Sequence, residues 1–485
     1  SNTNVVPIDD IRQFTEELEK AGQLKRIKTE VDTNLEIAEI LRRVSYTNGP
    51  AILFENVKGY EIPVLGNAFG SIKRLEIGLE TAEFSEIGQR IADMTKMEIP
   101  AGIFNKIRKL PELSKMSESF PKLEKSGPVT EIVNESPSFD KIPILKSWPK
   151  DAGKFITFGL VATKHPDTGV RNLGVYRIQI IDSTHALMHW QKHKRGAAHY
   201  DISKEKDKKI DAAIIIGGEP ATVFSAIAPV PEGLDKYLFA GITRKKGIRT
   251  VKCKTVDLEV PANAEMVLEG YVDSTDIRNE GPFGDHTGFY TPEEPFPTFT
   301  LTGIMQRKNP IYLTTVVGKP ILEDAYIGKV IERSFLPLIR MLHPEVVDFS
   351  MPPAGWFQGL AIVSIKKRYP GQAKKAMMGL WGMGQLALTK IIIVVDHDVN
   401  VHDMNEVIWA VTTKTDAARD TIIIDNAPTD TLDPASPRVN LGSKLGIDAT
   451  QKTKEEGFER EIQEEVKVDV DTKKMVDSKW SSYGL

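Results

Sequence analysis

The stretch AEMVLEGYV (264–272) is rich in apolar and β-forming residues, and the middle of the chain repeats this composition many times. Turn residues separate the runs, and few helical patterns lie between them. Many short strands with few helices are typical of a barrel or a sandwich. We therefore expect residues 151–320 to form a β domain. Its other strand candidates are FITFGLVAT (155–163), NLGVYRIQII (172–181), HALMHW (185–190), DAAIIIGG (211–218), RTVKCKTVDLEV (249–260), TFTLTGIMQ (298–306) and IYLTTVV (311–317).

Helical and strand patterns alternate before this β domain. Ile8, Ile11, Phe14 and Leu18 follow helical spacing, AILFENV (51–57) has the composition of a buried strand, and 84–94 is again helical. These patterns predict an α/β domain over 1–110. Residues 111–150 then carry repeated prolines, which are unfavourable in helix interiors and central strands. We expect this stretch to be an extended connection between domains.

Helical patterns return after the β domain. AYIGKVIERSFLPLIRML (325–342) and VHDMNEVIWAVTTK (401–414) are helix candidates, and GLAIVSIK (359–366) and KIIIVVD (390–396) are strand candidates. A second α/β domain is predicted over 321–450. Residues 451–485 are highly charged, and we expect a surface helix or tail that packs on a neighbouring subunit.

The composition excludes several classes of protein. The chain has 485 residues, a hydrophobic fraction of 41% and a net charge of −4, so it has no general basic field for nucleic acid. No apolar run approaches the roughly 18–20 residues that span a bilayer, and the first residues lack the layout of a signal peptide. Cys253 is the one cysteine and cannot form an internal disulfide. We expect a cytoplasmic protein in a reducing compartment.

The segment NLGVYR (172–177) holds two candidate ligand-binding residues. Asn172 offers an amide, and the planar guanidinium of Arg177 can grip a carboxylate or phosphate through two hydrogen bonds. On a regular strand their odd separation would put them on opposite faces, unless a bulge at Gly174 relaxes the backbone. The alternative interpretation is an ordinary surface arginine.

The segment HALMHWQKHKRGAAHY (185–200) contains four of the nine histidines. His185, His189 and His193 would share one face of a helix and could bind zinc, although the neighbouring residues favour a strand. Lys194 and Arg195 precede a glycine, a pattern that suits a phosphate. A solvated basic turn is the alternative.

The segment EGPFGDHTGFY (280–290) places Glu280 and Asp285 five residues apart. Pro282 excludes a helix interior, and the glycines permit tight backbone turns, so we predict a rigid kinked loop. Such a loop can bring both carboxylates toward one point. Two close carboxylates raise the proton affinity of one, and we expect a proton donor near neutral pH, with an arginine holding the other ionised. By contrast, GLWGMGQ (379–385) lacks the order of a dinucleotide site, and we interpret it as packing.

Several of these motifs together resemble the UbiD family of decarboxylases, which use prenylated flavin mononucleotide (prFMN). They occur in the same order over about residues 8–450, and EGPFGDHTG is the most specific of them. The resemblance implies an N-terminal α/β domain, a central flavin-reductase-like split β-barrel and a C-terminal α/β domain that forms the dimer. The motifs are VYR (175–177), MHWQKHKRGA (188–197), KCKTVDLEVPANAEMVLEGY (252–271), EGPFGDHTGFYT (280–291) and LGSKLGIDAT (441–450).

The resemblance also implies roles for single residues. Arg177, Glu280 and Asp285 match the family's catalytic network, with Arg177 positioning the substrate carboxylate, Glu280 as its charge partner and Asp285 as proton donor. Asn172 and His193 match ligands of a manganese ion beside the flavin phosphate, where potassium can also bind. The cofactor-binding set is expected to comprise Asn172, Val175, Tyr176, Arg177, His189, Trp190, Gln191, His193, Lys194, Arg195, Lys236 and Lys390.

One position departs from the family pattern. In PVPEGLDKYLFAG (229–241), Lys236 stands where the family usually has a glutamate that binds the metal. An ammonium group has no lone pair for a divalent cation. Either Glu232 or Asp235 replaces that ligand, or the lysine charge replaces the metal beside the phosphate. Our hypothesis is the second.

The resemblance implies a non-oxidative, reversible carboxy-lyase that acts on an α,β-unsaturated or aromatic acid. MHWQKHK and TRKKGIR (243–249) favour trans-anhydromevalonate 5-phosphate, in isoprenoid biosynthesis, and 4-hydroxy-3-polyprenylbenzoate, in quinone biosynthesis, is the alternative. A flavin prenyltransferase of the UbiX type would supply the cofactor, and a homodimer or hexamer is expected. Two alternative hypotheses come from other classes of protein, namely a zinc hydrolase and a non-catalytic flavin-binding protein.

Overall fold

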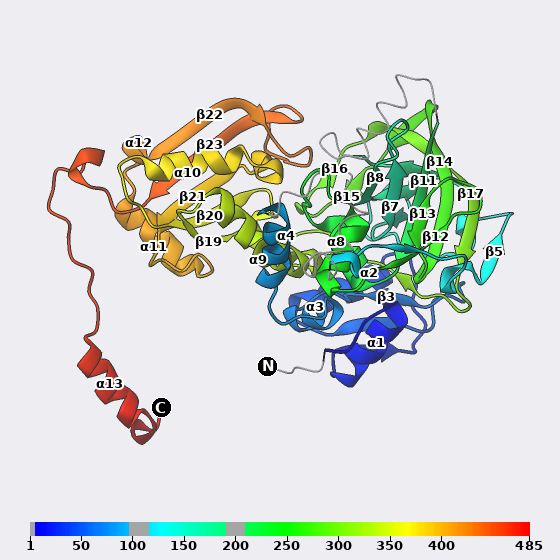
Figure 1. The fold of residues 1–485 in the computed structure, drawn as a ribbon, viewed down its shortest axis with the longest axis horizontal. Helices are drawn as coiled ribbons and strands as arrows, with labels where there is room; N and C mark the ends of the chain where they lie inside the picture. Colours follow the sequence, from blue (N-terminus) through cyan, green and yellow to red (C-terminus); the bar gives the residue numbers. More distant parts are fainter. Residues whose placement is uncertain (1–4, 97–115, 191–208) are drawn as a thin grey trace.

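The computed structural model describes residues 5–96, 116–190 and 209–485, and its N-terminal part is the predicted α/β unit (Figure 1). Ile11, Phe14 and Leu18 are buried on one face of the first helix, which confirms their helical spacing. The sheet has the order β1-β2-β3-β18. The elements are α1 (Ile11–Lys20), β1 (Leu24–Ile27), α2 (Glu36–Tyr46), β2 (Ala51–Phe54), β3 (Val64–Gly66), α3 (Ile72–Gly78) and α4 (Ser85–Lys96).

The fourth strand of that sheet comes from far along the chain. β18 (Tyr312–Leu313) runs parallel to β3, with Tyr312 opposite Val64. The expectation that IYLTTVV adds a strand to the β domain is therefore wrong for these two residues. Backbone pairing across such a sequence distance leaves no local pattern to read.

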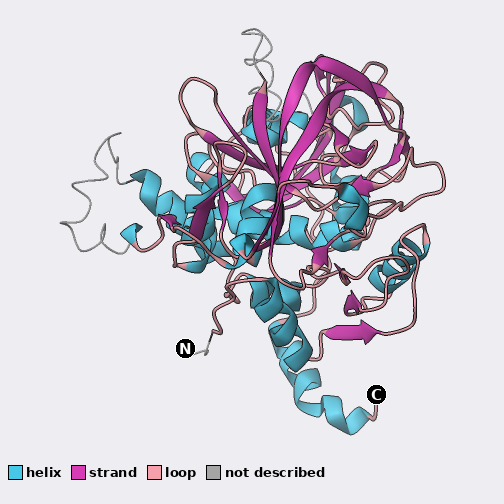
Figure 2. Cartoon of the chain, turned by 90° about the vertical axis from the view of Figure 1, so that its right-hand side faces the viewer, coloured by secondary structure: helices cyan, strands magenta, loops and turns pink. Residues whose placement is uncertain are grey.

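The central sheet is antiparallel, and its nine strands curl into an open half-barrel (Figure 2). The order is β6-β9-β10-β17-β14-β11-β7-β8, and β5 (Ile132–Asn134) pairs with β17. The strands are β6 (Phe155–Ile156), β7 (Leu160–Lys164), β8 (Arg171–Val175), β9 (Ile178–Ile180), β10 (His185–Met188), β11 (Ile210–Gly217), β14 (Ala264–Glu280) and β17 (Glu294–Gln306). Beside them lie α7 (Pro220–Ile227), α8 (Lys236–Arg244) and a small sheet of β4 (Lys122–Leu123), β12 (Arg249–Lys252) and β13 (Glu259–Pro261).

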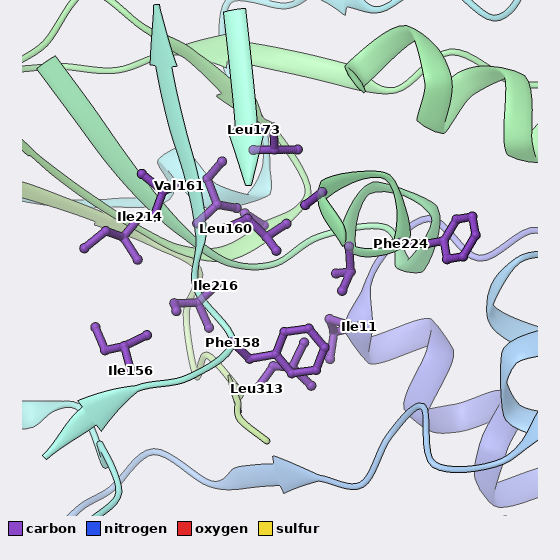
Figure 3. Packing of buried hydrophobic residues seen from close by; sticks show 14 of the residues in the cluster. Ile11, Ile156, Phe158, Leu160, Val161, Leu173, Ile214, Ile216, Phe224 and Leu313 are labelled. Atoms are coloured by element: carbon purple, nitrogen blue, oxygen red, sulfur yellow. The ribbon is translucent and has the colours of Figure 1, made fainter. Parts of the chain in front are cut away.

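One hydrophobic core joins the N-terminal unit to the half-barrel. Ile11 of α1 lies beside Phe158 and Leu313, and the barrel residues Leu160 and Ile216 continue the same cluster (Figure 3). All five side chains are buried. Because burial of such side chains is the main stabilising term in folding, these two units form one folded body.

The C-terminal unit is the second predicted α/β layer. Its mixed sheet has the order β19-β20-β21-β23-β22, and the long helix α9 (Glu323–Leu342) connects it to the barrel and packs against α4 (Figure 1). The elements are β19 (Val346–Ser350), β20 (Leu360–Ile365), α10 (Gln372–Trp381), β21 (Ile391–Asp396), α11 (Met404–Lys414), α12 (Ala417–Asp420), β22 (Thr421–Pro428) and β23 (Leu441–Ala449). Within the described ranges, no helix combines the length and apolarity that crossing a membrane requires.

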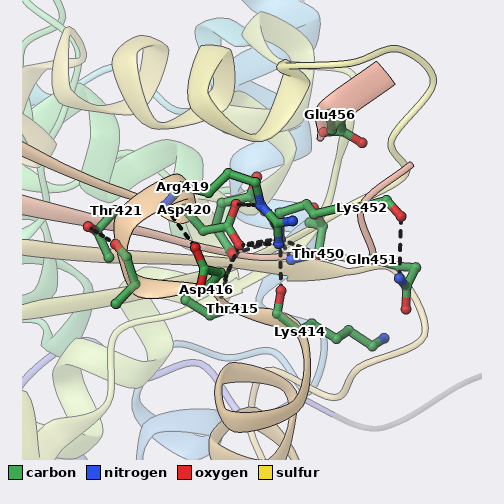
Figure 4. Close-up of polar contacts among 12 residues, drawn as sticks. Lys414, Thr415, Asp416, Arg419, Asp420, Thr421, Thr450, Gln451, Lys452 and Glu456 are labelled. Carbon is green, nitrogen blue, oxygen red and sulfur yellow. Dashed lines mark hydrogen bonds and ion pairs between the residues drawn. The ribbon is translucent and has the colours of Figure 1, made fainter. Parts of the chain in front are cut away.

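The last part of the chain leaves the body after a buried lysine. Lys452 donates to the carbonyls of Asp448 and Lys414, at 2.9 and 3.1 Å, and forms an ion pair with Asp420 (Figure 4). Beyond Gly457 nearly every residue is exposed, and α13 (Val470–Lys479) buries none of its side chains. Figure 1 shows this segment running clear of the C-terminal sheet.

Candidate active site

A kinked loop at the end of β14 carries the two carboxylates. β14 ends at Glu280, and the chain continues through β15 (Phe283–Gly284) to β16 (Tyr290–Thr291). Gly281 and Gly288 have φ values of +91° and +90°, a left-handed backbone that glycine adopts without steric cost. The prediction of a kinked loop is confirmed.

A buried aspartate outside the loop fixes its backbone. Asp151 Oδ1 accepts a hydrogen bond from the Gly284 N–H at 2.7 Å, and Oδ2 accepts one from the Trp148 N–H at 3.0 Å. The Trp148 indole lies against Gly284, where an added Cβ would be 2.4 Å from the indole Cδ1. Sequence reasoning missed Asp151, because its partners are backbone groups whose positions depend on the fold.

Arg177 lies between β8 and β9, and its guanidinium joins the two carboxylates. Nε and Nη2 donate to the two oxygens of Glu280 at 3.1 and 2.8 Å, and Nη1 donates to Asp285 Oδ2 at 2.5 Å. The guanidinium carbon lies 4.8 Å from the centre of the Phe283 ring. All three charged residues are at least nine-tenths buried. The interpretation of Arg177 as an ordinary surface arginine is therefore wrong.

Each carboxylate also has a histidine partner. His189 Nδ1 lies 2.8 Å from Glu280 Oε2, and His286 Nδ1 lies 2.9 Å from Asp285 Oδ1. The His286 backbone N–H donates to the same Asp285 oxygen at 2.8 Å. No role was expected for His286, although its position directly after the acid in EGPFGDHTGFY was a usable signal.

The expected raised pKa of one carboxyl group is not found. Burial alone would raise the pKa of Asp285, but the hydrogen bond and charge of His286, together with Arg177, outweigh it and lower the net pKa. Burial would also raise the pKa of Glu280, but the contacts with His189 and Arg177 outweigh this effect, and the net pKa of Glu280 is lowered as well. The prediction was wrong because each carboxylate has its own histidine partner in addition to the shared guanidinium, and these contacts favour the ionised form of both acids. Both groups are carboxylates at neutral pH.

These residues line a cavity of about 690 Å³ between the half-barrel, α9 and the C-terminal unit. This volume is within the range of cofactor and ligand sites. The barrel contributes Val175, Tyr176, Arg177, His189 and Asp285, and the remaining wall is mostly apolar. It includes Ile227, Ile327, Ile331, Phe335, Leu338, Met351, Phe357, Met383, Gly384, Leu386 and Leu432. Met383 and Gly384 belong to GLWGMGQ, so that segment also forms cavity wall.

The other expected cofactor residues that the structure describes are not among the residues lining this cavity. Trp190 is buried, with its ring edge-on to Tyr176 at 6.3 Å. The Asn172 amide is 3.4 Å from the Tyr176 hydroxyl, and Asn172 lines a second hollow of about 320 Å³. Lys236 Nζ donates to the Ala226 carbonyl at 2.9 Å, and Lys390 Nζ lies 3.3 Å from Asp433. The expected residues Gln191, His193, Lys194 and Arg195 lie outside the described residues.

The helical arrangement proposed for the zinc ligands is wrong for the described residues. His185 is in strand β10, where its ring lies 2.9 Å from Asp182, whereas His189 contacts Glu280. In the parts of the chain that the structure describes, no group of three or more metal-binding side chains occurs.

Three family models match this chain almost end to end. They are the N-terminal, Rift-related and C-terminal domains of 3-octaprenyl-4-hydroxybenzoate carboxy-lyase, over residues 15–94, 122–320 and 325–449. The chain belongs to the UbiD family. An uncharacterized protein from Archaeoglobus fulgidus is 51% identical to it over 474 residues, which cover 98% of each chain.

Solved UbiD-class structures share the whole fold. The closed form of vanillic acid decarboxylase from Sedimentibacter hydroxybenzoicus is 28% identical, with a TM-score of 0.87 over 98% of this chain and 99% of that one. An evolved dimeric form of HmfF from Pelotomaculum thermopropionicum, in complex with prFMN, is 26% identical, with a TM-score of 0.79 over 97% and 100%. The three-part UbiD architecture is thereby confirmed.

Proposed function

We propose that this UbiD protein is a prFMN-dependent, non-oxidative and reversible decarboxylase of an α,β-unsaturated or aromatic carboxylic acid. The observation that carries the proposal is the buried Arg177 held between Glu280 and Asp285 in the wall of a ligand-sized cavity. A plain flavin-binding protein has no need to bury three charged groups at one point, because each ion costs several kcal/mol to desolvate.

The side chains that line and surround the cavity are suited to binding a flavin. His189 Nε2 is buried, and among the described residues it has no hydrogen-bond partner, although its ring lies in the cavity wall. Buried polar atoms are rarely left unpaired, so a bound ligand is expected to contact this nitrogen. Val175, Tyr176 and Trp190 would flank the ring system, and Lys194 and Arg195 would contact the phosphate. When bound, prFMN supplies the electron sink that decarboxylation requires.

The protein groups have separate tasks in this proposal. Arg177 has five N–H donors, of which the structure commits three to Glu280 and Asp285. The remaining donors point to a role in holding the substrate carboxylate. Asp285 stands beside them and is proposed to deliver a proton to the carbon that loses CO2, while Glu280 keeps the guanidinium oriented.

We also propose that Lys236 takes the place of a divalent metal beside the cofactor phosphate. Asp235 forms an ion pair with Arg171 and accepts a hydrogen bond from the Tyr237 N–H at the start of α8. Both interactions already engage the carboxylate that could otherwise bind a metal. Elemental analysis of the flavin-loaded protein tests this. Less than a tenth of an equivalent of manganese is expected, and one equivalent of manganese held by Asn172 and His193 would overturn it. Potassium is measured in the same samples.

For the substrate we propose trans-anhydromevalonate 5-phosphate, with 4-hydroxy-3-polyprenylbenzoate as the alternative. A cavity of about 690 Å³ that also holds a flavin leaves room for a small acid, whereas a polyprenyl chain would have to extend out of the cavity. Two cations of TRKKGIR do not support a phosphate, because Arg244 is buried in ion pairs with Asp9 and Glu80, and Lys246 pairs with Asp9.

One experiment tests cofactor and activity together. The protein is produced with and without a flavin prenyltransferase, and the bound cofactor is identified by absorption and mass spectrometry before CO2 release is measured with both acids. Release from trans-anhydromevalonate 5-phosphate only after prenyltransferase co-production is expected. A protein that binds prFMN but releases no CO2 from either acid, or from a panel of simple unsaturated and aromatic acids, would contradict the proposal.

Assembly is proposed to involve the exposed tail. Residues 457–485 include Val466, Trp480 and Leu485, which are 97%, 55% and 91% exposed. A helix as short as α13 is marginal without tertiary packing, so we infer that the tail packs on a neighbouring copy in a homodimer or hexamer. Light scattering on the full chain and on a chain ending at Glu456 tests this. If both chains form particles with the same number of subunits, the inference is refuted.

A further inference from the structure

The rest state of Asp285 raises the question of where its proton comes from. Both of its oxygens accept hydrogen bonds: Oδ2 from Arg177 Nη1 at 2.5 Å, and Oδ1 from the His286 N–H and ring at 2.8 and 2.9 Å. A carboxylate surrounded by donors is ionised and has no proton to give. If Asp285 protonates carbon, another group must protonate Asp285 first.

His286 has the geometry for that task. Its Nδ1 faces a carboxylate oxygen, which only accepts, so Nδ1 carries the hydrogen. The ring lines the same cavity and is tilted against the rings of Trp356 and Phe357, at centroid distances of 6.3 and 6.4 Å. The side chain is 19% exposed, so water can reach it to restore a lost proton.

Charged groups from three structural elements face this imidazole. Asp285 is on its own loop, Asp324 is in the first turn of α9, and Asp430 follows β22 in the C-terminal unit. Asp324 and Asp430 also line the cavity. Burial lowers the pKa of His286, but these three carboxylates outweigh it, and the net pKa lies above the usual value. The C-terminal unit thus helps to keep a barrel histidine charged.

We propose that His286, which faces Asp285 in a cavity wall that Asp324 and Asp430 also line, supplies the proton that Asp285 delivers in every turnover. This rests on the proposed decarboxylase function. The C–C bond breaks and CO2 leaves, with the bonding electrons kept by the carbon. Asp285 Oδ1 first takes the proton of His286 Nδ1 and passes it to that carbon, which leaves Asp285 again as the carboxylate, and His286 then regains a proton from solvent water. One proton from solvent enters for each CO2 released.

The first test replaces His286 with asparagine. In His286→Asn an amide N–H can still donate to Asp285, but the side chain no longer titrates. We expect unchanged flavin content, a kcat lower by about 10²-fold, and loss of the fall in kcat that the parent enzyme shows as His286 deprotonates at higher pH. Added imidazole is expected to restore part of the rate. The matched control is His185→Asn, since His185 also pairs with an adjacent aspartate, Asp182, but on the exposed surface.

A second variant keeps the inference testable if His286→Asn loses its cofactor. Asp324→Asn removes one carboxylate that faces the imidazole while leaving His286 in place, so the basic limb of the kcat profile is expected to move to lower pH. A purely structural role for either residue would lower kcat at every pH alike. If both variants keep the parent pH profile, the inference is overturned. If the prFMN-loaded parent releases no CO2 from any acid tested, the proposed function fails instead.

Discussion

Replacing Asp285 with asparagine separates catalysis from cofactor binding most directly. The amide oxygen can take the place of Oδ1 and accept from both donors of His286, but the amide nitrogen then faces Arg177 Nη1. One charge-assisted hydrogen bond is lost and two donors oppose each other. Such a loss is worth about 2–3 kcal/mol of unfolding free energy. With an unfolding entropy of about 1 kcal/mol per degree for this length, the melting midpoint should fall by roughly 2–3 °C.

The effect of Asp285→Asn on turnover should be much larger than its effect on folding. General acid catalysis contributes about 10²–10⁴-fold, so kcat should fall by about that factor, or about 3–5 kcal/mol on the barrier. Flavin content should not change, since the amide keeps the shape of the side chain. The assay is CO2 release under saturating substrate, normalised to bound flavin by absorbance.

The pH dependence of stability in this variant has a defined sign. The folded pKa of Asp285 is lowered, so its stabilisation is present above the unfolded pKa, about 3.9, and is lost only as pH falls through the folded value. The stability difference between parent and variant should therefore shrink in acid. It should also shrink as pH rises from about 6.5 through the raised folded pKa of His286, because the variant removes the Asp285 charge that raises it. The control is Asp276→Asn, an exposed carboxylate paired with Arg278 beside the same sheet. Full turnover by Asp285→Asn would refute the reasoning, as would a loss of flavin equal to the loss of rate.

Three further substitutions test the supports of the site. Asp151→Ala leaves two buried backbone N–H groups unpaired, so melting experiments should show a loss of about 2–4 kcal/mol, together with a fall in kcat as the loop loosens. Gly284→Ala drives a methyl group into the Trp148 indole and should cost about 1–3 kcal/mol in urea unfolding, and an unchanged midpoint would contradict the packing. Burial raises the pKa of Glu323 to about 7, so the parent should lose stability as pH rises from about 4.3 through 7. Glu323→Gln should flatten that dependence, which unfolding at pH 5 and pH 8 would reveal.

Much of this fold could be predicted from local patterns. The helix predicted over 325–342 is α9, the helix predicted over 401–414 contains α11, and the β-rich middle is the half-barrel. These elements follow from periodicity, which each segment carries within itself. The placement of β18 in the N-terminal sheet, and the contact of Asp151 with Gly284, depend on segments brought together only by the fold. No single stretch of sequence contains that information.

At the site, too, some features could be predicted from the local sequence, whereas others depend on the three-dimensional arrangement. The kinked loop and its two acids could be predicted from the glycines and Pro282, and the partner Arg177 from the family motif. The direction of the pKa shifts could not, because it depends on where two histidines and the guanidinium lie in the fold. His189 and Arg177 lower the pKa of Glu280, and His286 and Arg177 lower the pKa of Asp285, in each case against the effect of burial.

The charges in this cavity determine how a substrate carboxylate is accommodated. Arg177 and a charged His286 balance Glu280 and Asp285, so the four groups together carry little net charge. A substrate carboxylate entering beside Arg177 adds one negative charge to a site with little water to screen it. Departure of neutral CO2 leaves that charge on carbon, and one proton removes it. A cation that already faces Asp285 can supply that proton where the charge develops, because the same contacts that keep Asp285 ionised at rest place the donor nitrogen His286 Nδ1 2.9 Å from Asp285 Oδ1.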